Sequence, residues 1–306
     1  MNILVTGISG YIGSRLCPRL LRDGHSLRGF SRHARELPQY PQIPVFEGDA
    51  VSGEGLERAL EDVEVAYFLI HSMEAAANGS FVARDRAAAE NFARAAQAAG
   101  TRRIVYLGGL VPEGGPRSAH LSSRLEVERT LLAAAPDSVA FRASIVIGAG
   151  SRSFRFLVRL VERMPVLTVP AWRTRRTTPV DERDIIELLV RAAASEEVSG
   201  QSLDAGGPEV VTYGQLIDRI RHHLLLGRPT IGFKRLIVTP IASRVAAVIA
   251  GEDPDLIGPL MESLGDDLVA RDDRAMRLLG VRVHSLDAAI ERALRELEAT
   301  EPLAAR

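Results

Sequence analysis

Several residue types that define particular protein classes are scarce in this chain of 306 residues. Its single cysteine, Cys17, excludes a disulfide within the chain and a cysteine-based metal cluster. Cys17 falls early in a helical pattern, where a buried and inert thiol is the simplest interpretation. The formal net charge of −1 at pH 7 provides no net basic field that would attract nucleic acid.

Long apolar runs are also missing. No run reaches the ~20 residues that a membrane-spanning helix needs. The N-terminus lacks the charged lead and the cleavage site of a secretory signal, and its apolar run fits a first strand. We therefore expect a cytoplasmic protein without a membrane span. A chain of this length can bury a large core, in one elaborated domain or in one domain with a smaller lobe.

Lysine is almost absent. Lys234 is the only one, and arginine supplies the other positive side chains. Any chemistry that requires a lysine amine must therefore use Lys234.

The segment that opens the chain, residues 2–13 (NILVTGISGYIG), carries its most informative pattern. An apolar run ends in three glycines, and an amphipathic stretch follows. Gly7 allows the sharp turn out of a strand, Gly10 lets the backbone approach a pyrophosphate, and Gly13 lets the next helix pack on the sheet. The helix N-terminus then offers free N–H groups to the phosphates. An ordinary turn rarely needs three glycines so arranged, so the pattern predicts dinucleotide binding.

Short apolar runs and helical patterns alternate through the first two thirds of the chain. Strands are predicted at residues 3–6, 26–30, 45–48, 65–70, 103–107 and 139–147, and helices at residues 11–22, 55–61, 81–99, 125–134, 154–163 and 184–194. This alternation predicts an α/β fold with a Rossmann-type, doubly wound parallel sheet. From Thr212, which fits a helix N-cap, the pattern is mostly helical. We expect a dinucleotide-binding domain at residues 1–195 and a smaller, mostly helical lobe at residues 196–306, interleaved with late core elements.

These patterns together resemble the short-chain dehydrogenase/reductase superfamily. The glycines at 7, 10 and 13 have its Gly-x-x-Gly-x-x-Gly spacing, and residues 48–49 (GD), 178–184 (TPVDERD) and 206–209 (GGPE) match further segments of its extended members. Residues 67–73 (YFLIHSM), 106–110 (YLGGL) and 170–175 (PAWRTR) are similar to an atypical subgroup, the YbjT-like and NmrA-like NAD(P)-binding proteins. The resemblance implies a bound NAD(P), with Asp49 at the adenine.

Most of the predicted cofactor contacts lie in the loops that follow the predicted strands. They are Thr6, Gly7, Ser9, Gly10, Tyr11, Ile12, Gly13, Arg15, Ser31, Arg32, Asp49, Ala50, Leu69, Ile70, His71 and Arg124.

The end of the second predicted strand bears on which dinucleotide is bound. An acidic residue there would bind a ribose 2′-hydroxyl and favour NAD. The chain reads FSRH at 30–33, with no carboxylate before Glu36. Arg32 could pair with a 2′-phosphate while Ser31 donates a hydrogen bond, and Arg15 is a second candidate phosphate partner. We therefore predict NADP(H), with NAD(H) as the alternative.

The catalytic residues of the superfamily are altered. Standard members use Ser, Tyr and Lys, with the Tyr and Lys one helical turn apart. None of the five tyrosines here has a lysine four residues on. His120 falls where the Tyr is expected and Arg124 where the Lys is expected, and the Ser position falls at Gly108 or Gly109.

Three residues are therefore the candidates for catalysis. His120 could act as an acid or base, since histidine titrates near neutrality, although a surface position at a helix start is the simpler interpretation. Arg124 could bind ribose or phosphate, but it cannot shed its proton. His71 follows the fourth strand, where the family places the nicotinamide ribose, and could donate a proton or contact the ligands.

The segment at 172–176 (WRTRR) could clamp an anionic or planar substrate. It could equally be a solvated loop with ion pairs to Asp181, Glu182 and Asp184. The helices at 88–99 and 125–134 could form the face of a homodimer.

Three functions stay open. The first is an NADP(H)-dependent oxidoreductase acting on a small apolar or quinone-like substrate. The second is a non-catalytic NADP(H)-binding redox sensor or regulator, as the similarity to NmrA-like proteins implies. The third, a sugar-nucleotide epimerase, is disfavoured by the missing Tyr.

Overall fold

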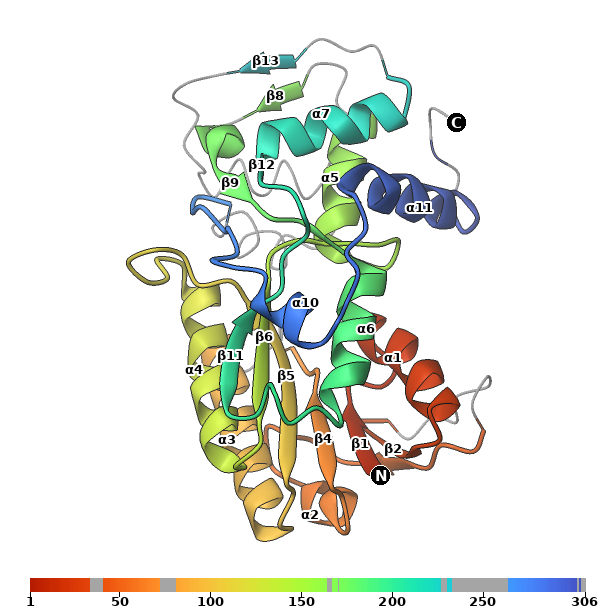
Figure 1. Cartoon of the computed structure of the whole chain (residues 1–306), viewed down its shortest axis with the longest axis vertical. Coiled ribbons are helices and arrows are strands. Elements are labelled where there is room, and N and C mark those ends of the chain that lie inside the picture. The colour runs from red at the N-terminus through yellow and green to blue at the C-terminus, as the bar shows by residue number, and fades with distance from the viewer. Residues whose placement is uncertain are drawn as a thin grey trace.

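A seven-stranded sheet forms the base of the molecule (Figure 1). The computed structural model describes residues 1–33, 41–71, 81–163, 167–169, 171–226, 230–232, 264–301 and 303. Glu36, Lys234 and residues 72–73 lie outside these ranges. The strand order is β11-β6-β5-β4-β1-β2-β3, and every neighbouring pair is parallel. The strands are β1 (Asn2–Thr6), β2 (Ser26–Ser31), β3 (Val45–Glu47), β4 (Val65–Phe68), β5 (Arg103–Gly109), β6 (Val139–Ala143) and β11 (Gln201–Asp204).

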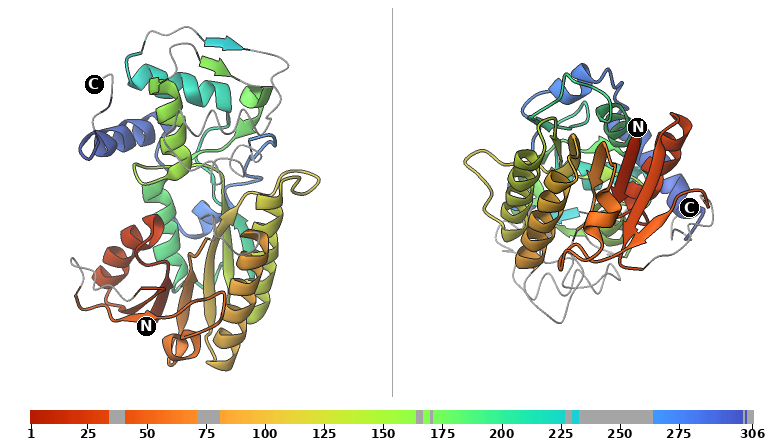
Figure 2. Two further views of the ribbon diagram at one scale, coloured as in Figure 1. Left: turned by 180° about the vertical axis from the view of Figure 1, so that it is seen from behind. Right: turned by 90° about the horizontal axis from the view of Figure 1, so that it is seen from below.

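Helices cover both faces of this sheet, as the view from below in Figure 2 shows. One face packs against α1 (Tyr11–Arg22) and α6 (Glu182–Ala192), and the other against α2 (Leu56–Leu60), α3 (Phe81–Ala98) and α4 (Ala119–Ala134). The strand order reverses between β1 and β4, which is the doubly wound arrangement. The predicted α/β fold is confirmed.

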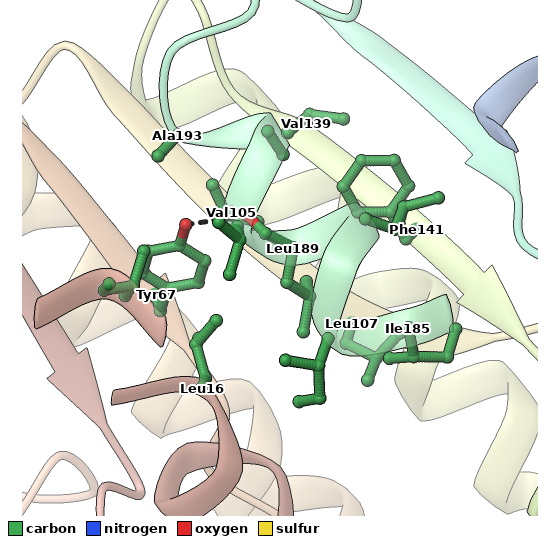
Figure 3. Close-up of a cluster of buried hydrophobic side chains, with 14 of the residues drawn as sticks. Leu16, Tyr67, Val105, Leu107, Val139, Phe141, Ile185, Leu189 and Ala193 are labelled. Atoms are coloured by element: carbon green, nitrogen blue, oxygen red, sulfur yellow. Dashed lines mark hydrogen bonds between the residues drawn. The ribbon is translucent and has the colours of Figure 1, made fainter. Parts of the chain in front are cut away.

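Side chains of successive strand residues enter opposite cores. Ile3 and Val5 pack on the α1–α6 side, whereas Leu4 packs on the other side, because side chains alternate along a strand. Figure 3 shows the first of these clusters, in which the Tyr67 hydroxyl donates a 2.8 Å hydrogen bond to the Leu189 carbonyl of α6. Cys17 is buried there, and burial raises the pKa of its thiol to about 12.

Helix α4 begins earlier than the predicted residue 125. Ser118 caps it, with its hydroxyl accepting a 3.2 Å hydrogen bond from the Leu121 N–H. The early start has a consequence for the site, because it places His120 and Arg124 one turn apart on the same helix.

The predicted strand at 139–147 is wrong in its second half. β6 ends at Ala143, and β7 (Val146–Ile147) pairs instead with β10 (Val180–Asp181). Between them, the Ser144 hydroxyl donates a 2.8 Å hydrogen bond to the Thr178 carbonyl. This contact holds the chain at the point where it leaves the sheet after β6.

The second core lies above the sheet in Figure 1 and collects residues from several segments. Its elements include α5 (Arg152–Arg163), η1 (Ala171–Thr174), β9 (Arg176–Thr177), β12 (Val211–Thr212), α7 (Tyr213–His223) and α11 (Leu286–Glu298), while β8 (Leu167–Val169) pairs with β13 (Thr230–Gly232). Thr212 caps α7 in a reciprocal pair with Gln215, which confirms the predicted N-cap. Helix α10 (Arg274–Leu278) returns to pack on the sheet. Within the described ranges, no helix is long and apolar enough to cross a bilayer.

Candidate functional site

The glycine-rich loop joins β1 to α1 in a very tight turn. Gly7 has a φ of +65°, and its carbonyl accepts a 2.9 Å hydrogen bond from the Gly10 N–H. A Cβ on Gly13 would lie 2.3 Å from that carbonyl oxygen, and a Cβ on Gly7 would lie 2.8 Å from the Leu69 carbonyl oxygen. Gly7 and Gly13 are therefore required, because a larger side chain would clash at both positions and Gly7 also has a positive φ.

The start of α1 fits an anion. Gly10 is the N-cap and provides no capping side chain, and the first turn contains no acidic residue. The N–H groups of this turn are left to a ligand, and the positive end of the helix dipole faces it. The loop thus fits the pyrophosphate of a dinucleotide.

Thr6 is fully buried and fixes the loop after β4. Its hydroxyl donates a 2.9 Å hydrogen bond to the Tyr67 carbonyl and accepts a 3.0 Å hydrogen bond from the Leu69 N–H. The sequence predicted a direct cofactor contact for Thr6. The structure places it behind the site, where it positions the segment that ends in His71.

A cavity of about 530 Å³ lies at the carboxyl ends of the strands, where ligands of doubly wound folds bind. Of the predicted site residues it brings together Gly7, Ser9, Gly10, Tyr11, Ile12, Gly13, Ser31, Arg32, Asp49, Ala50, Leu69, Ile70, His71, His120 and Arg124. Thr6 and Arg15 are not among its walls.

Arg15 pairs with two carboxylates outside the described cavity walls. Its guanidinium lies 3.5 Å from the Glu182 carboxylate at the start of α6 and 3.2 Å from the Glu296 carboxylate of α11. Arg15 thus links α1 to the second core, and its phosphate contact stays a prediction.

The adenine end is built from the loops after β2 and β3. Ser31 and Arg32 follow β2, and Asp49 follows β3. The Asp49 carboxylate accepts a 2.8 Å hydrogen bond from the Val51 N–H, so it is held in a fixed orientation. Asp49 is the sole carboxylate among the described wall residues.

The opposite end of the cavity holds the predicted catalytic residues. Arg124 is 6% exposed, and its guanidinium contacts Nδ1 of His71 and lies 3.5 Å from Nε2. Because a guanidinium only donates, the contacted Nδ1 accepts and Nε2 carries the proton. His120 lies one turn before Arg124 on the same wall. Within the described ranges, Arg124 forms no ion pair with a carboxylate.

Both histidines are neutral at neutral pH. Burial and the Arg124 charge lower the pKa of His120 to about 3. Burial, the Arg124 charge, His120 and Arg152 lower the pKa of His71 well below its usual range. The His71 side chain is exposed and lines the cavity, and the adjacent Arg124 guanidinium disfavours a second positive charge on it. The lowered pKa values favour the neutral form of both imidazoles at pH 7.

Tyr11 holds the glycine-rich loop against the segment that leads to α5. A Cβ on Gly150 would lie 2.4 Å from Cδ2 of Tyr11, and one on Gly148 would lie 2.0 Å from the Tyr11 hydroxyl. Burial and the nearby Glu182 carboxylate raise the pKa of Tyr11, so its phenol stays protonated.

Sequence reasoning missed the far walls of the cavity, which come from remote segments. These walls are formed by Arg84, Ile145, Arg152, Ser153, Phe156, Leu157, Tyr213, Leu264 and Leu268, among others. The helical pattern at 154–163 was evident in the sequence, but nothing local indicated which of its residues would face a ligand.

The segment around Trp172 does not reach the cavity walls. Trp172 is buried in the second core, with its ring 5.9 Å from that of Tyr213. Arg176 pairs with Asp267 at 3.3 Å rather than with the acids at 181–184. Those acids have other partners, such as Arg183 for Asp181.

Comparison with known proteins agrees with this site. Residues 7–134 match a family described as NAD(P)H-binding. The N-terminal part of the chain is therefore similar to the NAD(P)H-binding proteins of this family.

Several curated relatives are enzymes by name. A 3 beta-hydroxysteroid dehydrogenase/Delta 5→4-isomerase of Mycobacterium tuberculosis is 32% identical over 113 residues, which are 34% of this chain and 30% of that protein. A ceramide reductase of Caulobacter vibrioides is 27% identical over 190 residues, 61% of this chain and 59% of that protein. The chain thus spans less than a third of the length of the first curated relatives it matches.

Solved structures share the fold at low identity. A nucleoside-diphosphate-sugar epimerase from Staphylococcus aureus has a TM-score of 0.75 at 15% identity, with 95% of this chain and 100% of that chain covered. A likeness at this identity establishes the architecture.

Proposed function

We propose that the protein is an NADP(H)-dependent oxidoreductase of the atypical short-chain dehydrogenase/reductase type. Its substrate is a small molecule with an apolar body and a carbonyl or hydroxyl group. The NAD(P)H-binding family match and the names of the two relatives, a hydroxysteroid dehydrogenase and a ceramide reductase, support this class of reaction. The observation that carries the proposal is Arg124, a buried guanidinium at the end of the cavity away from the adenine site.

The residues present fit the cofactor. The glycine-rich loop and the start of α1 would hold the pyrophosphate, and Asp49 would contact the adenosine. Arg32 with Ser31 would bind a 2′-phosphate, because no described wall residue after β2 is acidic. Bound NADP(H) supplies or accepts the hydride.

In this proposal, Arg124 takes the place of the Tyr–Lys pair because its positive charge stabilises the negative charge that develops on the substrate oxygen. A buried cation without a carboxylate partner is costly unless a negative charge comes close to it. The oxygen of a substrate carbonyl acquires that charge as it is reduced, so a pre-positioned guanidinium stabilises the oxygen more in the transition state than in the ground state. Since Arg124 cannot be deprotonated, water supplies the proton to the oxygen.

The two neutral histidines position this group. His71 accepts a hydrogen bond from Arg124 through Nδ1 and lines the cavity beside it. His120 adds bulk and polarity without a competing charge, because its pKa is about 3. The site therefore keeps one permanent charge where the substrate oxygen would bind.

The test is NADPH consumption by the intact protein over a panel of aldehydes, ketones, enones and quinones, with NADPH affinity measured in parallel. For a substrate found in this way, Arg124→Met should lower kcat by roughly 10²–10³ and leave NADPH affinity within a few-fold. Arg86→Gln, an exposed arginine of α3 that pairs with Glu126, is the matched control. An Arg124→Met variant with unchanged kcat would refute the role of Arg124.

The non-catalytic sensor is the second candidate, and the lowered pKa values of both histidines at this end of the cavity favour it. Tight NADPH binding with no consumption across the whole panel would replace the oxidoreductase proposal with this one.

A further inference from the structure

The part of the cavity beyond the dinucleotide site has an uneven distribution of charge. Three arginines line it, Arg84, Arg124 and Arg152, and the only carboxylate among the described wall residues, Asp49, belongs to the adenine end. The two histidines between them are neutral at pH 7, so they do not change this balance. Arg152 lies close enough to His71 for its charge to act on that ring. This end of the cavity is therefore electropositive.

Helix α5 presents the Arg152 guanidinium and an apolar surface on one face. Its wall residues are Arg152, Ser153, Phe156 and Leu157, whose spacing places them on the same side of a helix. Arg152 is exposed at the first position of this twelve-residue helix, where unpaired N–H groups add positive potential. Phe156 and Leu157 follow one turn later and belong to the second core.

The apolar surface continues from α5 across the cavity. Ile145, Leu264 and Leu268 line it together with the ring of Tyr213. A molecule lying along α5 would thus meet a guanidinium at one end and a largely apolar wall further on. An apolar substrate without charge would leave Arg152 unused, and a small polar anion would leave the apolar wall uncovered.

We propose that the substrate is an amphiphile: a carbonyl or hydroxy compound with an apolar chain and an anionic head group that pairs with Arg152. A guanidinium pairs with a carboxylate or a phosphate through two parallel hydrogen bonds, which gives the head group one orientation. Arg124 is then left to the reacting oxygen. The inference rests on the proposed function and specifies its substrate class.

Binding of unreactive probes tests the inference without turnover. Octanoate, octanol, octyl phosphate and acetate are titrated calorimetrically into the full-length protein, with and without NADP⁺. Octanoate should bind at least tenfold more tightly than octanol, which corresponds to about 1.4 kcal/mol. It should also bind more tightly than acetate, because acetate lacks the chain.

Variants separate the charge from the chain. Arg152→Gln should weaken octanoate at least tenfold and leave octanol unchanged, whereas Arg86→Gln should change neither. Phe156→Ala should weaken octanoate and octanol alike. Tighter binding of octyl phosphate than of octanoate would support the inference and assign the head group as a phosphate.

Two results would overturn it: equal affinity for octanoate and octanol, or unchanged octanoate affinity in Arg152→Gln. NADPH affinity, measured separately, keeps this outcome distinct from a failure of the proposed function. A protein that binds NADPH but shows no preference for anionic probes refutes only the substrate class. A protein that binds no NADPH refutes the proposed function.

Discussion

Replacing Thr6 by valine tests whether the junction of β1 and β4 positions the cofactor loop. The side chains are nearly equal in shape, so the substitution removes the hydroxyl and little else. That hydroxyl is fully buried and makes two hydrogen bonds, of 2.9 Å to the Tyr67 carbonyl and 3.0 Å from the Leu69 N–H. A buried hydrogen bond contributes about 1 kcal/mol net, and an unpaired partner costs about 1–3 kcal/mol. We therefore expect the free energy of unfolding to fall by about 2–3 kcal/mol.

Thermal unfolding and NADPH titration measure the effect. For a chain of this size the loss corresponds to a fall in Tm of roughly 3–5 °C. NADPH should bind roughly five- to tenfold more weakly, because Leu69, Ile70 and His71 line the cavity and their backbone is no longer fixed.

Thr6→Ser is the matched control. It keeps the hydroxyl and loses one methyl group, which costs about 1 kcal/mol without a change in NADPH affinity. If the Val and Ser variants have the same Tm and the same NADPH affinity, the hydrogen bonds of Thr6 do not position the loop.

Two further substitutions test the cofactor site, and a change of pH tests the protonation of His120. Arg32→Ala should weaken NADPH by roughly tenfold or more and NADH much less, since it removes a charge-assisted contact to the 2′-phosphate; equal losses would refute that contact. Gly13→Ala should abolish NADPH binding, measured by fluorescence titration, because its Cβ would lie 2.3 Å from the Gly7 carbonyl oxygen; normal affinity would contradict the tight turn. The free energy of unfolding should fall as the pH is lowered from 6.5 towards 3, because the unfolded chain protonates His120 while the folded chain, with a pKa of about 3, does not. This contribution amounts to at most about 2 kcal/mol at pH 5, so a pH profile unchanged in His120→Asn would show that the imidazole is charged in the folded protein.

Local patterns allowed the sheet and the glycine-rich loop to be predicted. The turn at 7–13 depends on residues adjacent in sequence, and the strands buried on both faces appear as continuous apolar runs. The roles of these residues therefore needed no knowledge of distant segments. The same holds for Thr212, whose capping partner is three residues away.

The features that could not be predicted from the sequence depend on contacts between residues far apart in the chain. Arg15 follows the glycine-rich loop, and its contact with Glu296, which is 281 residues away, could not be predicted from the local pattern. The early end of β6 depends on the carbonyl of Thr178, and the far wall of the cavity depends on how α5 packs on α7. The start of α4 is different, because the signal was local and the prediction missed it: Ser118 is a regular N-cap after a loop that contains Gly114 and Gly115.

The chain passes between the two cores several times. It leaves the sheet at β7, returns with α6 and β11, leaves again for α7, returns with α10 and ends in α11. A deletion from the C-terminal side would therefore remove the edge strand β11 together with the second core, and one from the N-terminal side would leave α7 and α11 without α5. We therefore expect that the cofactor-binding half would not fold when it is expressed alone, and that a single fusion point would not exchange it for that of a relative. A new substrate specificity has to arise by substitutions within the cavity walls, because the architecture offers no lobe that can be swapped as a unit.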